Sequence, residues 1–282
     1  VKHGAVPLVA DARVALEKIS VALGDHRATA ADADIRAEWL EAVTTHCQPR
    51  DVGEGYLPLD AEVIGAVQRA TGEDAIAMCA AGTMPGALKL LWQPSQGGYH
   101  MEYGYSCMGY EIAGAMGLKL ARPEREVICF VGDGSYMMAN SELATAVMRR
   151  VPFTVVLTDN RGYGCINRLQ TLGCGGAPFN NMYVDCNVEA QPEIDYVAHA
   201  AAMGAYAVKA RDIADLEAKI AQARGRDIPT VIVIETSAEK GPGFGDAGHW
   251  WAVSVPAVSK TDKSRAAYAE YLENMTCQRL VN

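Results

Sequence analysis

The stretch VICFVGDGSYMMANSELATAVMRRVPFTVVLTDNRGYGCIN, Val127 to Asn167, decides the fold. Two runs rich in β-branched residues, VICFV and FTVVLTD, enclose one helical pattern, and polar residues and glycines follow each run. Buried parallel strands read as nearly continuous apolar runs, and a helix is the usual crossover between two of them. This stretch therefore predicts a strand, a helix and a second parallel strand, with polar groups at both strand ends.

The same alternation continues on both sides of this unit. It predicts strands at 74–80, 126–131, 153–158, 205–209 and 229–235, and helices at 61–72, 111–121, 136–150, 193–203 and 212–224. Asp60 is the expected cap of the first of these helices, and 161–181 reads as irregular. Alternation of this kind predicts an α/β fold with a doubly wound parallel sheet covered on both faces.

The amino-terminal part reads as a separate piece. VPLVAD has a strand pattern, residues 12–23 and the segment IRAEWLEAV have helical patterns, and QPRDVGEGYLP then breaks the order with Pro and Gly. The chain starts without Met and in mid-pattern. We therefore expect 1–50 to be the end of a middle domain with its linker, and 51–282 to be one domain with a carboxyl-terminal tail.

Composition excludes several classes of protein. The net charge of −9 argues against a nucleic-acid-binding surface, and half of the 282 residues are apolar, as in a soluble globular protein. The eight cysteines show no C-x-x-C spacing, so we expect reduced thiols and a cytoplasmic protein. There is no apolar run of about twenty residues, and the first residues lack the pattern of a signal peptide.

Asp133 and Asn160 suggest a metal site. Ligands of such a sheet bind beyond the carboxyl ends of its strands, and these two residues follow the two strands of the opening stretch, 27 positions apart. That spacing suits one crossover, so a carboxylate oxygen and an amide oxygen can meet there. With a backbone carbonyl from the loop they would supply half of an octahedral Mg²⁺ shell, leaving room for phosphate oxygens and water.

The flanking residues favour a phosphate. Gly132 and Gly134 permit close backbone approach, and a helix opening at Ser135 would point free N–H groups at an anion. A plain strand-to-helix turn is the alternative. A G-x-G-x-x-G dinucleotide motif is excluded because position 137 is Met137, and a P-loop is excluded because no G-K-[ST] follows.

The stretch GDGSYMMANSELATAVMRRVPFTVVLTDN resembles the GDG…N signature of thiamine diphosphate enzymes such as acetolactate synthases. CAAGTMPGALKLLW, YHMEYGYSCMGYEIAGAMGLKLA and YGCINRLQ are similar to the trihydroxycyclohexane-1,2-dione hydrolase branch of inositol catabolism, a likeness covering nearly all of residues 1–240. The resemblance implies the fold of the diphosphate domain. It also implies that Asp133, Asn160 and the carbonyl of Gly162 hold Mg²⁺.

The resemblance assigns further cofactor contacts. Gly134, Ser135 and the Gly82–Thr83 loop would contact the diphosphate, with Gly132 beside them. Met108 would hold the cofactor in a V shape, and the peptide groups of Ser106 and Met108 would bind the aminopyrimidine edge. The alternative for Met108 is ordinary core packing at a helix start.

The reaction that the resemblance implies is hydrolytic cleavage of a carbon–carbon bond in trihydroxycyclohexane-1,2-dione, giving 5-deoxyglucuronate. The family's activating glutamate belongs to an amino-terminal pyrimidine domain, and Glu102 and Glu111 lie too near the diphosphate half to replace it. We therefore expect a pyrimidine-binding domain or chain to complete the site, in a homodimer or homotetramer. Two alternatives remain open: a decarboxylase or carboligase acting on 2-oxo acids, and a non-catalytic assembly subunit.

Four polar residues are candidates for gripping the substrate hydroxyls. They lie in stretches that read as irregular, near the expected strand ends: His100, Asn167, Gln170 and His249. Segment 241–253 is expected to be mobile and to close the site. Its Trp250 and Trp251 have an alternative role to closing the site, which is packing within the fold or contact between subunits.

Overall fold

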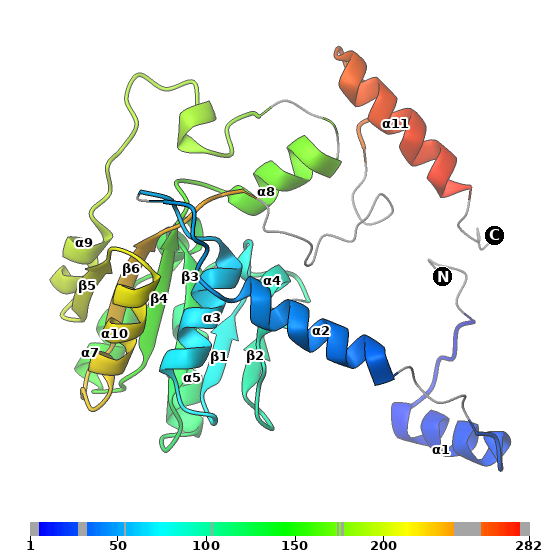
Figure 1. The fold of residues 1–282 in the computed structure, drawn as a ribbon, viewed down its shortest axis with the longest axis horizontal. Helices are drawn as coiled ribbons and strands as arrows, with labels where there is room; N and C mark the ends of the chain where they lie inside the picture. Colours follow the sequence, from blue (N-terminus) through cyan, green and yellow to red (C-terminus); the bar gives the residue numbers. More distant parts are fainter. Residues whose placement is uncertain are drawn as a thin grey trace.

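The computed structural model describes residues 6–27, 33–53, 55–102, 104–173, 175, 178–239 and 255–276. Within these ranges, six parallel strands form one sheet in the order β2-β1-β3-β4-β6-β5 (Figure 1). The strands are β1 (Ile76–Cys79), β2 (Tyr99–Met101), β3 (Val127–Gly132), β4 (Thr154–Asp159), β5 (Tyr206–Ala210) and β6 (Thr230–Glu235). The predicted α/β fold with a parallel sheet is confirmed.

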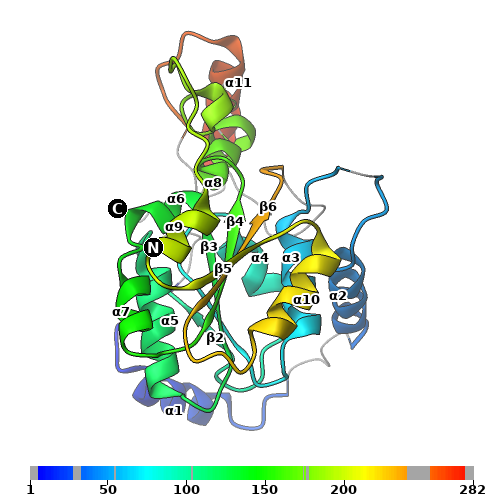
Figure 2. The same ribbon diagram turned by 90° about the vertical axis from the view of Figure 1, so that its left-hand side faces the viewer.

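Helices cover both faces of the sheet, as Figure 2 shows. The helices on one face are α3 (Asp60–Ala70), α4 (Met84–Leu91) and α10 (Ile213–Ala223). Those on the other are α5 (Tyr110–Ala121), α7 (Glu142–Met148) and α9 (Tyr196–Ala202). Because both faces are buried, the central strands consist of nearly continuous apolar residues, which is why they could be recognised in the sequence.

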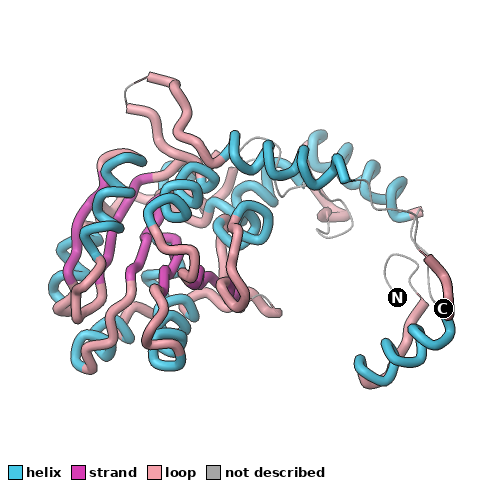
Figure 3. Tube along the Cα trace, turned by 60° about the horizontal axis from the view of Figure 1, so that its bottom comes forward, coloured by secondary structure: helices cyan, strands magenta, loops and turns pink. Residues whose placement is uncertain are grey.

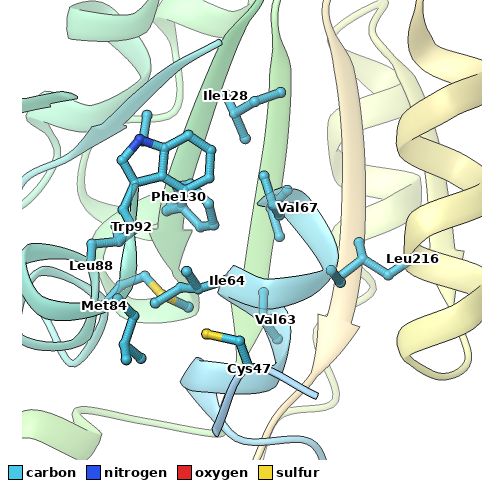
Figure 4. Close-up of a cluster of buried hydrophobic side chains, with 14 of the residues drawn as sticks. Cys47, Val63, Ile64, Val67, Met84, Leu88, Trp92, Ile128, Phe130 and Leu216 are labelled. Carbon is cyan, nitrogen blue, oxygen red and sulfur yellow. The ribbon is translucent and has the colours of Figure 1, made fainter. Parts of the chain in front are cut away.

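Figure 4 shows the core between α3, α4, α10 and the sheet. The Trp92 ring meets Phe130 edge-on at a centroid distance of 6.2 Å, and its Nε1 donates to the Gly98 carbonyl over 3.0 Å. Ile64 and Leu216 bring the two long helices into the same cluster. Burial of each large apolar side chain contributes about 1.5–3 kcal/mol, so this layer holds the strand ends as a rigid platform.

Three helices lie outside the layers that cover the sheet: α1 (Ala12–Leu23), α2 (Ala33–His46) and α11 (Asp262–Met275) (Figures 1 and 3). Helix α1 buries none of its residues, although the Asp11 side chain caps it by accepting from the N–H of Val14. Helix α2 reaches the core near its end, through Val43. Within the described ranges, every helix lacks the length or the apolar character of a transmembrane helix.

Several local expectations were wrong. The segment VPLVAD is not a strand, because no other strand lies beside it and Val9 is fully exposed. The single helix expected at 136–150 is two helices, α6 (Asp133–Met138) and α7, interrupted by the non-helical backbone of Ala139. Asp60 is the first helical residue of α3 and not its cap; Glu62 instead accepts the N–H of Leu59.

Other elements were missed by the sequence analysis. The section 161–181, expected to be irregular, holds α8 (Gly164–Arg168) and a π-helix (Leu169–Gly173), and a 3₁₀ turn (Tyr183–Asp185) follows it. Helices α4 and α11 and strand β2 were also not predicted. Most of these are short, and short elements carry too few residues to show a hydrophobic period.

Candidate functional site

Strands β3 and β4 are neighbours and end together. Gly132 lies opposite Thr158 in their register, so Asp133 and Asn160 both follow at the same edge of the sheet. The backbone N–H of Gly162 donates to Asp133 Oδ2 over 2.9 Å. The loop after β4 therefore folds back onto Asp133, and the residues predicted to bind Mg²⁺ come together at one edge.

Asp133 is a carboxyl group in an unfavourable setting. It is 1% exposed, and burial, followed by the negative charge of Asp159, raises its pKa to about 7. The N–H groups of Gly134 and Gly162 oppose this shift only in part. A cation beside Asp133 would remove the penalty, because an opposite charge favours the ionised form.

Asp133 Oδ1 and Asn160 Oδ1 are buried oxygens at this edge without a hydrogen-bond partner among the described residues. Buried polar atoms are nearly always paired, so each such atom requires an explanation, and a bound ion is one. A carboxylate and an amide oxygen are hard ligands that suit Mg²⁺. The described residues contain no cluster of three His, Cys, Asp or Glu side chains, so a metal here would depend on amide and backbone oxygens.

Gly162 is required by the shape of its loop. Its φ is +148°, and a Cβ there would lie 2.4 Å from the Asn181 carbonyl oxygen and 2.8 Å from Met182 Cα. On either side, Tyr163 N–H donates to Asn181 O over 2.7 Å, and Tyr183 N–H donates to the carbonyl of Arg161 over 2.9 Å. The sequence analysis had no signal for this pairing, because it joins two segments without strand patterns.

The predicted diphosphate contacts surround the same edge. A Cβ on Gly82 or Gly132 would meet nothing within 4 Å, so both backbones face open space that a ligand can approach. Gly134 is different, because a Cβ there would lie 2.6 Å from the Tyr163 ring. Thr83 is half-buried, and a side-chain hydrogen bond joins it to Asp60.

Ser135 has a partner that was not anticipated. Its hydroxyl donates to Glu111 Oε1 over 2.7 Å and accepts from the N–H of Gly109 over 2.9 Å. Because the Ser135 hydroxyl is already paired, a contact with the diphosphate would come from the backbone N–H of Ser135. That contact stays a prediction. The sequence analysis excludes Glu111 as the activating glutamate and predicts no other role for it. The one sequence signal for its buried contacts is a charge at the start of the apolar helix EIAGAMGLKLA.

The segment before α5 presents the predicted aminopyrimidine contacts. Ser106 is exposed with a left-handed φ of +55°, and Met108 is only half-buried. The N–H of Cys107 donates to Glu102 Oε2 over 2.8 Å and lowers the pKa of that carboxyl. Met108 is thus not an ordinary core residue, and its role as a cofactor prop stays a prediction.

Three of the four candidate substrate residues lie in regular elements, not in irregular stretches as expected. His100 is in β2, where its ring stacks on Tyr110 at 6.1 Å with Nε2 3.3 Å from the hydroxyl. Asn167 lies in α8 with its side-chain oxygen buried and unpaired, and Gln170 lies in the π-helix, where it accepts from the Asn181 amide. His249 and segment 241–253, with Trp250 and Trp251, fall outside the described residues.

Comparison with known proteins agrees with this geometry. Residues 80–234 match the family described as thiamine pyrophosphate enzyme, C-terminal TPP binding domain. The chain is 35% identical to a 3D-(3,5/4)-trihydroxycyclohexane-1,2-dione hydrolase of Geobacillus thermodenitrificans, over 99% of this chain and 48% of that protein. It is 33% identical to the enzyme of that name from Halalkalibacterium halodurans, over 98% and 47% respectively.

A solved structure shares the fold. It is the thiamine diphosphate-dependent 4-hydroxybenzoylformate decarboxylase of Rhodococcus jostii RHA1, with a TM-score of 0.56 and 24% identity, over 67% of this chain and 34% of that one. The chain spans about half the length of the curated relatives that it matches. On the family match and the strand-end geometry together, the chain belongs to the thiamine pyrophosphate enzymes and carries their C-terminal cofactor-binding domain.

Proposed function

We propose that this chain is the diphosphate- and magnesium-binding part of a hydrolase that cleaves a carbon–carbon bond in trihydroxycyclohexane-1,2-dione, giving 5-deoxyglucuronate in inositol catabolism. The unpaired oxygens of Asp133 and Asn160 at adjoining strand ends carry the proposal of the metal site. The names of the relatives support the choice of substrate. We also propose the division into 1–50, the end of a middle domain, and 51–282.

The residues present fit the cofactor and its metal. Asp133, Asn160 and the carbonyl of Gly162 would hold Mg²⁺, which would supply positive charge for the diphosphate. The Gly82–Thr83 loop and the turn Gly132–Ser135 would hold the diphosphate itself, the two glycines at open space permitting its approach. When bound, thiamine diphosphate supplies an electron sink for the pair released as a carbon–carbon bond breaks.

The remaining site residues act by position. Met108 would press on the cofactor from a half-buried place, while the peptide groups of Ser106 and Met108 would bind the aminopyrimidine edge. Asn167 offers a buried, unpaired amide oxygen that can accept from a substrate hydroxyl. His100 and Gln170 are second candidates for that contact, and each already has a partner.

A second domain or chain would complete the site. The activating glutamate of the family belongs to a pyrimidine domain, and this chain matches about half of each relative. Apolar side chains are exposed beside the cofactor edge: Met137 at 45% and Met138 at 53% on α6, and Ile166 at 52% on α8. We propose that they pack against that domain in a homodimer or homotetramer, and that this polypeptide alone binds the cofactor weakly and turns over nothing.

A reducing, cytoplasmic location is part of the same proposal. Burial raises the pKa of the Cys79 thiol to about 12 and also raises that of Cys129. Thiols of this kind stay protonated and inert.

Two measurements test the function. The first is the intact mass of everything that copurifies with the chain, with thiamine diphosphate and magnesium quantified in the same sample; a companion chain with stoichiometric cofactor is expected for an assembled enzyme. The second is the rate at which that assembly converts the cyclic dione, compared with its rate on pyruvate in a separate assay. Turnover of pyruvate alone would replace the proposal with a 2-oxo acid enzyme, and turnover by the isolated chain would contradict the need for a second domain.

A further inference from the structure

Glu111 is a completely buried carboxylate in the first turn of α5. Its Oε2 accepts from the N–H of Gly109 over 2.9 Å, and its Oε1 accepts from the N–H of Ala81 over 3.2 Å and from the hydroxyl of Ser135 over 2.7 Å. All three groups donate, and a carboxylate offers two oxygens that only accept. Three donors therefore share this one side chain as their acceptor.

The three donors come from three different segments. Ala81 follows β1 and precedes Gly82, Gly109 follows Met108, and Ser135 lies in the first turn of α6, directly after Gly134. Each donor is thus the direct neighbour of a residue that we place at the cofactor. One carboxylate sets the spacing between the diphosphate loop, the aminopyrimidine segment and the metal-binding turn.

The arrangement is poorly suited to core stability alone. Within the described residues Glu111 forms no ion pair, and a buried carboxylate without a cation is expensive to desolvate. An apolar side chain would fill the same space at the start of an apolar helix without that penalty. One of its donors, Gly109, has a φ of +94°, and a Cβ there would lie 2.8 Å from the Ala139 Cβ. Three segments thus meet at this one group.

We propose that Glu111 is a positioning residue that holds the three cofactor-binding segments in register, and so determines the affinity for thiamine diphosphate with Mg²⁺. This inference rests on the proposed function, because the segments matter together only if they bind one ligand. Glu111 itself does not contact the cofactor in this proposal; it acts through Ala81, Gly109 and Ser135.

The test is Glu111→Gln in the full chain, with thiamine diphosphate and Mg²⁺ titrated by calorimetry. The amide group of Gln puts a donor where at least one of the three donors now finds an acceptor. Hydrogen bonds to charged groups are strong, so we expect the affinity for the cofactor to fall about tenfold or more. Urea unfolding without cofactor, measured on the same samples, separates positioning from loss of the fold.

Glu62→Gln is the control, although Glu62, unlike Glu111, also pairs with the Arg50 guanidinium, Nε to Oε2 over 3.0 Å. Glu62 is also buried, at 1% exposure, also lies in the first turn of a helix, α3, and also accepts backbone N–H groups, from Arg50 and Leu59, each over 2.8 Å. It holds none of the three segments. We expect Glu62→Gln to lower the stability while leaving the cofactor affinity within about twofold of wild type.

The outcomes separate the two proposals. If the wild-type chain binds the cofactor and Glu111→Gln binds it equally well, Glu111 is not a positioning residue and the proposed function stands. If both glutamate variants weaken binding equally, the effect is general destabilisation and the inference is overturned. If the wild-type chain, assembled with the domain or chain that completes the site, does not bind even millimolar cofactor, the proposed function fails and the inference fails with it.

Ser135→Ala keeps the test decisive should Glu111→Gln fail to fold. It removes one donor and leaves the buried carboxylate with its two backbone partners. We expect weaker cofactor binding and faster hydrogen exchange at the amide of Ala81, which donates to Glu111 and not to Ser135. Unchanged exchange at the Ala81 amide would overturn the inference. If Glu111→Gln folds, the double variant should lose less affinity than the sum of the two single changes, as contacting residues do.

Discussion

The backbone N–H of Gly162 donates to Oδ2 of Asp133 over 2.9 Å, across 29 positions of sequence. This bond closes the loop after β4 onto the end of β3, and it leaves the other oxygen of Asp133 buried without a partner. The unpaired Asn160 oxygen lies at the same edge. These two oxygens lie where they could bind a cation. The contribution of each residue to the proposed site can be tested separately.

Asn160→Ala removes the amide oxygen of the proposed metal site. We expect the affinities for Mg²⁺ and for thiamine diphosphate to fall together, each by about tenfold or more, because the proposed Mg²⁺ would help the protein to hold the diphosphate. Calorimetric titration with Mg²⁺ alone, and then with cofactor at saturating Mg²⁺, checks this. An unchanged cofactor affinity would remove Asn160 from the site.

The metal-free chain should lose stability as the pH rises through the pKa of Asp133. Burial and Asp159 raise this pKa from 3.8 to about 7, so the folded chain holds the proton more tightly than the unfolded chain. The stabilisation is fully present below the unfolded value and is lost as the pH rises through the folded one. The loss amounts to as much as about 4 kcal/mol over this window.

Asp133→Asn is the control for this pH dependence. Its amide does not titrate, so urea unfolding of the variant should lack this part of the fall in stability. Mg²⁺ should restore the wild-type chain at high pH and have no such effect on the variant. Identical pH profiles for the two chains would show that Asp133 is not the group responsible.

Gly162→Ala should damage both the fold and the metal site. A Cβ at this position meets the Asn181 carbonyl at 2.4 Å, in addition to the strain of a φ of +148°. We expect a loss of stability of roughly 1–3 kcal/mol from the backbone strain, more from the displaced loop, and weaker Mg²⁺ binding. Denaturant unfolding and metal titration measure the two effects.

Gly225→Ala isolates the backbone strain. Gly225 has a φ of +80°, and a Cβ there meets nothing within 4 Å. This variant should lose about 1–2 kcal/mol of stability and keep its affinity for Mg²⁺. Equal stability losses in the two glycine variants would contradict the steric role of the 181–182 segment.

Met108→Ala should affect the cofactor more than the fold. Met108 is half-buried, so its truncation leaves little cavity, whereas the fully buried Met78 is a core residue. We expect Met78→Ala to cost about 2–5 kcal/mol of stability and Met108→Ala about 1 kcal/mol or less. Of these two variants, only Met108→Ala should weaken cofactor binding when both are measured under conditions in which they are folded. If Met108→Ala instead loses much stability and binds the cofactor normally, Met108 is a core packing residue.

Much of the fold followed from local patterns. Strands β3, β4 and β6 are buried on both faces, so their sequences are nearly continuous apolar runs that are easily recognised. The polar residues after β3 and β4 stand out against those runs. The family resemblance of the GDG…N stretch is confirmed by the match over residues 80–234.

The failures occurred where a partner segment decides the structure. Strand β2 has three half-buried residues and forms only because β1 lies beside it. VPLVAD has a better strand pattern and forms no strand, because nothing pairs with it. Strand pairing is a tertiary property, and the residues of one segment do not reveal whether a neighbour exists.

The sequence by itself determined the buried strands, the placement of Asp133 and Asn160 after two of them, and the family to which these belong. Only the tertiary structure decided that the N–H of Gly162 binds Asp133, that the 181–183 segment holds this loop, and that Glu111 joins Ala81, Gly109 and Ser135. Burial and period are local properties that the residues record. Hydrogen bonds between loops depend on where the chain returns in space, which the loop residues alone do not specify.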